Sequence, residues 1–255
     1  MRENKNKRSV ATGYPLFLSL IVVLALTAST PLQAQDPSNR KLYTVAAQWV
    51  EEGPQIDGSL EDEVWSSAGR IDQFTQQEPQ EGAPATERTE VLILYDSNNL
   101  YFGLRAFESE PGGIIATEMR RDSPRLLEED NFQIIIDTFN DHRSGYMFVT
   151  NPLGGRLEQQ IFEEGEGFAR GTTSNVNRDW NGVWTVVTRR SEEGWTAEIL
   201  IPLTTIRLRQ DEVQSWGINF MRNIRRKNEQ VFWAPISKEY TITRVSLAGT
   251  MTGIG

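Results

Sequence analysis

Apolar and polar residues alternate along most of the chain with the two-residue period of β-strands. The clearest case is a pair of runs, residues 130–138 and 146–152, separated by the turn-forming residues 140–145. The apolar face of the first run is formed by Phe132, Ile134 and Ile136. Its other face carries Gln133 and Asp137 beside apolar residues. The sequence therefore predicts a central β-hairpin whose outer face suits either a metal or a sugar.

The same alternation predicts short strands over the remainder of the chain. We expect them at residues 42–50, 70–76, 91–95, 100–106, 157–162, 183–189, 195–201, 216–221, 229–233 and 245–251. A short helix capped by Ser59, with Asp62 as its capping-box partner, would place Trp65 at the end of the core. Hairpin spacing without a long helix predicts an all-β fold, a jelly-roll-like β-sandwich of roughly ten antiparallel strands.

The first 34 residues differ in composition from the rest of the chain. A basic start precedes an apolar run at residues 16–26, and the small residue Ala34 follows at a suitable cleavage point. This pattern predicts a signal peptide at residues 1–34 and a β-sandwich domain at residues 35–255. The protein would then be exported, to the periplasm, the outer membrane or the medium. An uncleaved membrane anchor is the alternative interpretation.

Charge and composition exclude several classes of function. The net charge of −9 becomes about −12 without residues 1–34, which carry four basic residues and one acidic residue. Such an acidic protein lacks the basic surface that nucleic-acid phosphates require. The absence of cysteine excludes disulfides, thiol nucleophiles and thiolate zinc sites. A Ser/His/Asp triad would depend on the single histidine, His142, in a predicted turn.

Two groups of acidic and amide side chains are candidates for chemistry. Asp137, Asn140 and Asp141 offer hard oxygen ligands around one turn, as Ca²⁺ prefers, so a structural calcium ion is one hypothesis. The alternative is a hairpin turn closed by the same side chains. The consecutive acids at residues 128–130 could be a glycosidase acid/base pair, but their spacing is also typical of a solvated acidic loop.

Aromatic rings are the second kind of candidate, because sugars stack their C–H faces on them. The candidate rings are Trp233, Tyr240 and Tyr146. Trp233 could instead be a core residue, since it and Phe232 must face opposite sides of a strand. A basic group between residues 220 and 233 could be a binding patch or a solvated hairpin tip: Arg222, Arg225, Arg226 and Lys227.

Several short motifs occur in a characteristic order along residues 42–255. They are Ile56-Asp57-Gly58 with Trp65, Tyr95-Asp96 with Leu100-Tyr101, Asp130-Asn131-Phe132 with Ile136-Asp137, and residues 195–202. This ordered set resembles carbohydrate-binding module family 9. A second set resembles the subtype found at the N-terminus of long bacterial outer-membrane β-barrel proteins: Arg143, Tyr146-Met147-Phe148, Asn151-Pro152-Leu153-Gly154, Trp216-Gly217, Phe220-Met221-Arg222 and Trp233-Ala234-Pro235.

The resemblance implies a non-catalytic module that binds an oligo- or polysaccharide in carbohydrate catabolism, often with structural calcium. A barrel domain absent from this chain would be its partner. The alternatives are a periplasmic docking domain without a sugar ligand and, third, an activity associated with glycoside hydrolysis.

The resemblance also implies where a ligand would bind. Sugar-binding members hold the ligand between two aromatic rings, and Leu127 stands here in the place of one of them. Gln133 replaces a glutamate of the family, and Val149 replaces an arginine. We therefore expect a site with one aromatic wall, Trp233 or Tyr240, beside Gln133 and Tyr146.

Overall fold

A computed structural model describes residue 1 and residues 42–165, 175–209 and 213–255. The predicted signal peptide lies outside the described residues, apart from Met1, and so does the middle of the loop that follows residue 162. No helix among the described residues is long and apolar enough to span a membrane.

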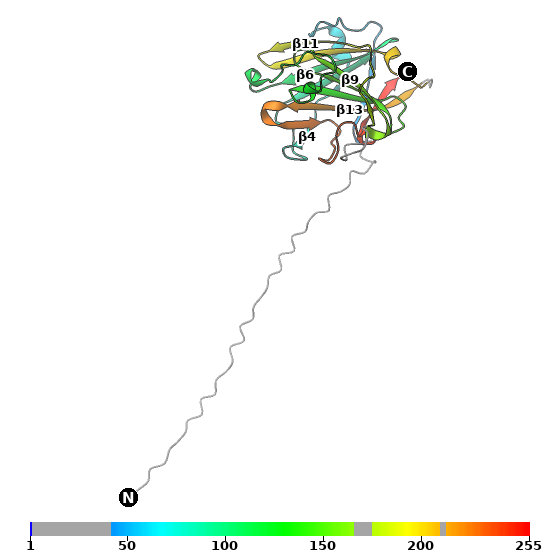
Figure 1. Cartoon of the computed structure of the whole chain (residues 1–255). Helices are drawn as coiled ribbons and strands as arrows, with labels where there is room; N and C mark the ends of the chain where they lie inside the picture. The colour runs from blue at the N-terminus through cyan, green and yellow to red at the C-terminus, as the bar shows by residue number, and fades with distance from the viewer. Residues whose placement is uncertain (2–41, 166–174, 210–212) are drawn as a thin grey trace. The chain divides into compact units, whose positions relative to one another are not determined.

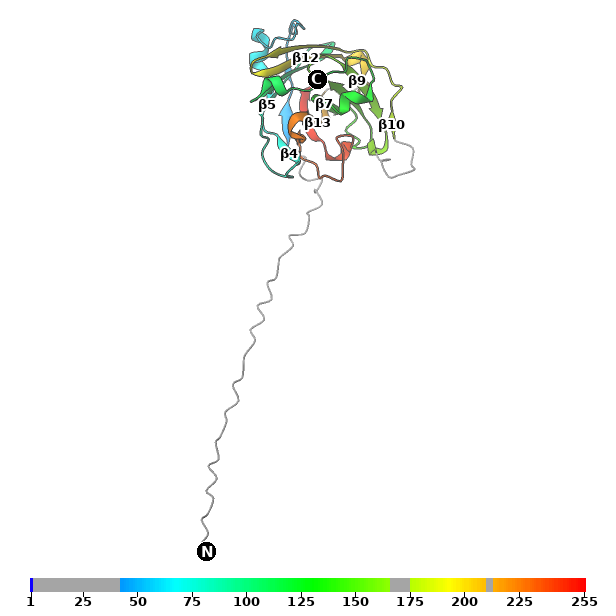
Figure 2. The same ribbon diagram turned by 60° about the vertical axis from the view of Figure 1, so that its left-hand side comes forward.

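The described residues form fifteen strands in two facing sheets (Figure 1). Sheet A has the order β1 (Thr44–Ala46), β15 (Gly249–Ile254), β13 (Gln214–Ile224), β7 (Asn131–Asp137), β8 (Gly145–Thr150), β9 (Arg156–Ile161) and β10 (Val176–Asn177). It is completed by β14 (Glu229–Phe232), which pairs with β13, and by β4 (Thr75–Glu78), which pairs with β14. Figure 2 shows β10 beyond β9 at one edge of this sheet.

Sheet B has six strands and closes the sandwich from the other side. Its order is β11 (Thr185–Ser191), β12 (Gly194–Pro202), β6 (Asn99–Phe107), β5 (Thr89–Tyr95) and β2 (Gln48–Trp49), with β3 (Gly69–Ile71) also paired to β5. Short 3₁₀ helices connect the strands: η2 (Glu63–Ser67), η3 (Pro111–Gly113), η4 (Pro124–Leu127), η5 (Glu163–Gly165), η6 (Leu203–Thr205), η7 (Arg225–Lys227) and η8 (Val245–Leu247).

The predicted all-β sandwich is confirmed, but its strands are more numerous than ten and not all antiparallel. β1 pairs in parallel with β15, and β2 pairs in parallel with β5. The predicted strand at residues 42–50 is broken at Ala47, because the chain passes there from sheet A to sheet B. The Ala47 N–H still donates to the Thr252 carbonyl at 2.9 Å. The predicted strand at residues 245–251 begins instead as η8.

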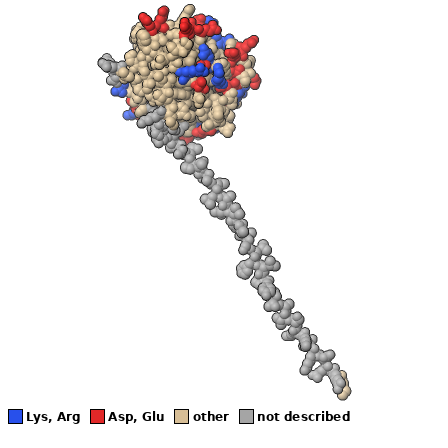
Figure 3. Space-filling model, turned by 180° about the vertical axis from the view of Figure 1, so that it is seen from behind, with Lys and Arg blue, Asp and Glu red and all other residues tan. Residues whose placement is uncertain are grey.

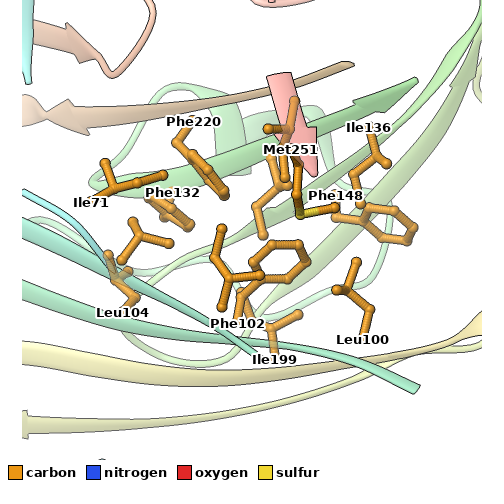
Figure 4. Packing of buried hydrophobic residues seen from close by; sticks show 14 of the residues in the cluster. Ile71, Leu100, Phe102, Leu104, Phe132, Ile136, Phe148, Ile199, Phe220 and Met251 are labelled. Carbon is orange, nitrogen blue, oxygen red and sulfur yellow. The ribbon is translucent and has the colours of Figure 1, made fainter. Parts of the chain in front are cut away.

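The predicted central hairpin is present as β7 and β8, paired antiparallel in sheet A. The apolar face of β7 packs toward sheet B, where Phe132 stacks on Phe220 with ring centroids 5.8 Å apart. Phe102 of sheet B meets Phe220 edge-on at 5.7 Å. Figure 4 shows these rings among the aliphatic side chains between the layers. Burying this much apolar surface is the main favourable contribution to folding.

The segment before β3 covers the outer face of sheet B, and here the helix prediction was wrong. η2 is a 3₁₀ helix with Asp62 at its N-cap, and the Asp62 carboxylate accepts the N–H of Gln55 at 2.8 Å instead of capping. Trp65 is buried in a cluster with Leu60 outside the sheet, not at the end of the core. Gly103 makes room for these two side chains, because a Cβ there would lie 2.7 Å from Leu60 Cδ2.

Three of the four predicted basic residues at 222–227 form ion pairs in the fold, whereas Arg225 is exposed on η7. Arg222 is fully buried, and its Nη2 lies 2.6 Å from Glu108 Oε1. Arg226 contacts Glu108 and Glu87, and Lys227 lies 2.6 Å from Glu87. These ion pairs join sheet A to the loops of sheet B. Figure 3 shows another general feature, acidic side chains gathered along the upper and right-hand margins of a largely uncharged face.

Candidate functional site

The outer face of sheet A is hollowed into a cavity of about 290 Å³. Its floor consists of cross-strand neighbours, since Gln133 of β7 lies opposite Met221 of β13, and Met147 of β8 lies opposite Gln159 of β9. The apolar residues of the lining are Pro124, Leu127, Met147, Leu157, Val176, Met221, Phe232 and Ile242. Four amides also line the cavity: Gln77, Gln133, Gln159 and Gln230.

The amides of the cavity retain unused hydrogen-bonding capacity. Gln133 donates from Nε2 to Asn131 Oδ1 at 2.9 Å, which leaves its Oε1 without a partner among the described residues. The side chains of Gln159 and Gln230 make no hydrogen bond to any described residue. Buried amides are normally paired. These groups therefore present donors and acceptors that a polar ligand could satisfy.

Gln77 has a different role, because it holds one rim of the cavity in place. Its Nε2 donates to the carbonyls of Ser237 at 2.9 Å and Tyr240 at 3.0 Å. The adjoining residues Thr241 and Thr243 line the cavity, and their hydroxyls lie 2.6 Å apart. The rim is thus a loop anchored to sheet A through one amide.

Of the four residues predicted to bind sugar, Gln133 lines the cavity and two rings lie elsewhere. Trp233 is 6% exposed and packs in the core, with its ring centroid 6.0 Å from that of Phe220. Tyr146 is also in the core, with its ring 4.9 Å from that of Trp180. Strand alternation explains both positions, because Tyr146 and Trp233 point toward sheet B while Met147 and Phe232 point outward.

Tyr240, the fourth predicted residue, lies next to the rim of the cavity. Its side chain is partly exposed, and the guanidinium of Arg244 lies 4.8 Å from the ring centroid. The ring does not line the cavity, whereas the neighbouring Thr241 does. Leu127 does line it, so the position expected to lack an aromatic wall is part of the site.

The sequence did not single out Gln77, Gln159 or Gln230. Gln159 could have been found from strand pairing, because antiparallel register with the predicted hairpin places it beside Met147 on the outer face. Gln77 and Gln230 depend on the pairing of β4 with β14, two strands about 150 residues apart in the chain. A local sequence pattern cannot predict the pairing of two strands that are so far apart in the chain.

Of the three candidate calcium ligands, Asp137 and Asp141 are hydrogen-bond acceptors within the turn itself, and Asn140 contributes its backbone N–H. Asp137 accepts the backbone N–H of His142 at 2.9 Å, and burial raises the pKa of its carboxyl. Asp141 accepts the N–H groups of Arg143 and Ser144, both at 2.8 Å, and the Ser144 hydroxyl. No cluster of three acidic or histidine side chains suitable for a metal occurs in the described parts of the chain. The donor set fits a hairpin turn and does not fit a calcium site.

Of the acids at residues 128–130, Glu128 is exposed to solvent, and none of the three lines the cavity. Glu129 and Asp130 are buried. Asp130 accepts the N–H of Ile115 at 2.7 Å, and Glu129 accepts the N–H of Thr117 at 2.7 Å. Burial raises the pKa of Asp130. These carboxylates fix the loop that precedes β7.

A family model described as "Carbohydrate family 9 binding domain-like" matches residues 56–234. The chain belongs to this family. Family 9 modules are non-catalytic, so the chain is a binding module and not an enzyme. No curated protein matches the chain.

Solved structures share the fold of this family 9 module. One is a candidate carbohydrate-binding protein from Bacteroides uniformis ATCC 8492, with a TM-score of 0.61, 12% identity, and coverage of 82% of this chain and 98% of that one. A family 9 module from Caldicellulosiruptor kristjanssonii in complex with cellotriose has a TM-score of 0.52 and 13% identity, covering 82% and 92% of the two chains. A glucose complex from the same organism is similar, with a TM-score of 0.52, 14% identity, and coverage of 82% and 94%.

Proposed function

We propose that this family 9 module binds an oligosaccharide, or the end of a polysaccharide, in the cavity of sheet A. The observation that carries the proposal is a set of amides, Gln133, Gln159 and Gln230, that lie among apolar side chains and keep polar atoms without a partner among the described residues. Apolar groups can cover the C–H face of a sugar while planar amides reach its hydroxyls. A cavity of about 290 Å³ is at the small end of ligand sites, so it suits one or two sugar rings.

The affinity should be weak because no well-exposed aromatic ring lines the cavity. Phe232 is the one aromatic residue of the described lining, and it is 1% exposed. We expect a Kd on the order of 1 mM, which corresponds to about 4 kcal/mol. Titration calorimetry of residues 35–255 with cellotriose measures it.

Two substitutions test whether the cavity is the binding site. Leu127→Trp supplies an aromatic wall and should tighten binding of cellotriose about tenfold, since one stacked ring is worth roughly 1 kcal/mol or more. Gln159→Ala should weaken binding without loss of stability, because its amide forms no hydrogen bond to any described residue. Gln48→Ala on exposed β2 is the matched control. Equal affinity in all four proteins would place the binding site elsewhere.

We further infer that the module is exported and serves carbohydrate catabolism. The apolar segment at residues 16–26 and Ala34 support cleavage at residue 34. An intact mass that begins at Gln35 is expected for the exported protein, and retention of residues 1–34 would contradict it. The motif order of the barrel-associated subtype supports an outer-membrane β-barrel as partner. If no glycan binds to any variant, docking to such a barrel becomes the better explanation.

A further inference from the structure

Three charged residues line the cavity: Asp122, Glu158 and Arg178. The side chain of Glu158 is fully buried, and its Oε2 accepts Trp184 Nε1 at 2.9 Å. Arg121 forms an ion pair with Glu158 and lies 3.8 Å from Asp122. Both acids are therefore balanced by the same arginine.

Arg178 is the unbalanced charge of the cavity. It forms no ion pair or hydrogen bond through its side chain with any described residue. It directly follows β10, which is held against β9 by the pairing of Val176 with Ile161. The next peptide is fixed as well, because the Asp179 N–H donates to Asn177 Oδ1 at 3.1 Å. The backbone at Arg178 is thus held at the cavity edge, and none of the five donors of its exposed guanidinium has a partner among the described residues.

We propose that the cavity is selective for an acidic saccharide, one with a uronic acid carboxylate that Arg178 binds. This inference rests on the proposed sugar-binding function and adds the class of sugar. A guanidinium matches a carboxylate bidentately, which gives stronger and more directional hydrogen bonds than a neutral hydroxyl can form. The neutral amides of the floor then bind the ring hydroxyls.

The net charge of the protein makes Arg178 necessary for this selectivity. A chain with a net charge of −9 repels anions at long range, so an acidic sugar gains nothing from the overall field. Any preference for the acid must come from a local contact. Because Arg178 is exposed, we expect a preference of about fivefold at low salt that shrinks at high salt.

The test compares an acidic oligosaccharide with its own neutral ester, and uses cellotriose as a neutral sugar of another kind. Trigalacturonic acid, its methyl ester and cellotriose are titrated by calorimetry into residues 35–255 at 50 mM NaCl. The unmodified protein should bind the acid about fivefold more tightly than the ester. Arg178→Gln should bring this ratio to about one. Asp122→Asn should increase the ratio by removing a repulsive carboxylate.

Arg125→Gln is the matched control, because Arg125 is exposed on η4 beside the cavity, is not part of its lining, and carries the same charge. It should keep the fivefold ratio. A ratio of one in the unmodified protein, or a ratio that Arg178→Gln leaves intact, would overturn the inference. If cellotriose binds and the acid does not, the acidic class is wrong and the proposed function stands. Failure of all three ligands to bind would overturn both.

Discussion

Arg222→Met should be among the most destabilising single substitutions in this module. The guanidinium is fully buried and donates four hydrogen bonds: to Arg88 O at 3.1 Å, Thr89 Oγ1 at 3.1 Å, Phe107 O at 2.9 Å and Glu108 Oε1 at 2.6 Å. Burial lowers the pKa of Arg222, and Glu108 opposes this shift. Its Nε has no partner among the described residues, so no acceptor there is left over to replace a lost hydrogen bond.

The expected loss of stability depends on which polar groups lose their partner in the Arg222→Met variant. Methionine fills most of the volume, but two carbonyls lose a donor and Glu108 keeps Arg226 as its remaining ion-pair partner. Removing one member of a buried ion pair costs about 3–5 kcal/mol. That is a large part of the roughly 5–15 kcal/mol that stabilises a typical domain.

Urea denaturation of residues 35–255, followed by tryptophan fluorescence, measures the loss. With a slope of about 2–3 kcal/mol per molar, the midpoint should fall by about 1–2 M. Arg70→Met is the control, because Arg70 also forms an ion pair, 3.0 Å from Glu90, but its side chain is 54% exposed. It should cost at most about 1 kcal/mol. Equal losses in the two variants would refute the view that burial determines the value of these pairs.

Two further predictions concern the hairpin turn and acid stability. Asp141→Ala should lower the free energy of unfolding by about 1 kcal/mol, because turn hydrogen bonds are lost. EDTA or excess Ca²⁺ should leave the Tm of the unmodified protein unchanged. A higher Tm in Ca²⁺ would restore the metal hypothesis. Burial alone would raise the pKa of Glu87, but Lys227 and Ser109 bring it to about 2. A lowered pKa stabilises the fold above the ordinary value of 4.5, and this contribution is lost as the pH falls toward 2. Glu87→Gln should therefore be less stable at pH 6 and lose less stability between pH 5 and pH 3 in urea titrations; identical pH profiles would contradict this.

Strand alternation was sufficient to orient the central hairpin but not to identify what covers it. Phe132 and Ile134 face the core and Gln133 faces outward, as the two-residue period predicts. The same rule predicted that Phe232 and Trp233 would lie on opposite faces, of which one must be buried. Both are buried, because the loop that carries Ile242 packs on the outer face of sheet A. That contact is not encoded in the local sequence pattern.

Long-range partners explain the other differences. Arg222 follows Phe220 on the inward face of β13, so its burial was implicit in the alternation, but its partner Glu108 lies 114 residues away. A charge that looks solvated in the sequence is thus paired in the fold. The turn acids show the opposite case. The Asp141 carboxylate accepts hydrogen bonds from donors within three residues. The sequence alone is equally compatible with this turn and with a metal site.

The distribution of charge in the cavity follows from the same physics. Three neighbouring strands, β14, β13 and β7, each contribute an uncharged residue to one row across the floor: Phe232, Met221 and Gln133. A charge at these buried positions would need a dedicated partner, since an unpaired buried charge is strongly unfavourable. The charges that line the cavity without burial, Asp122 and Arg178, lie in loops where water still reaches them. We therefore expect Asp122 and Arg178 at the rim to determine the preference for charged ligands. A substitution there can change selectivity without lowering the stability of the β-sandwich.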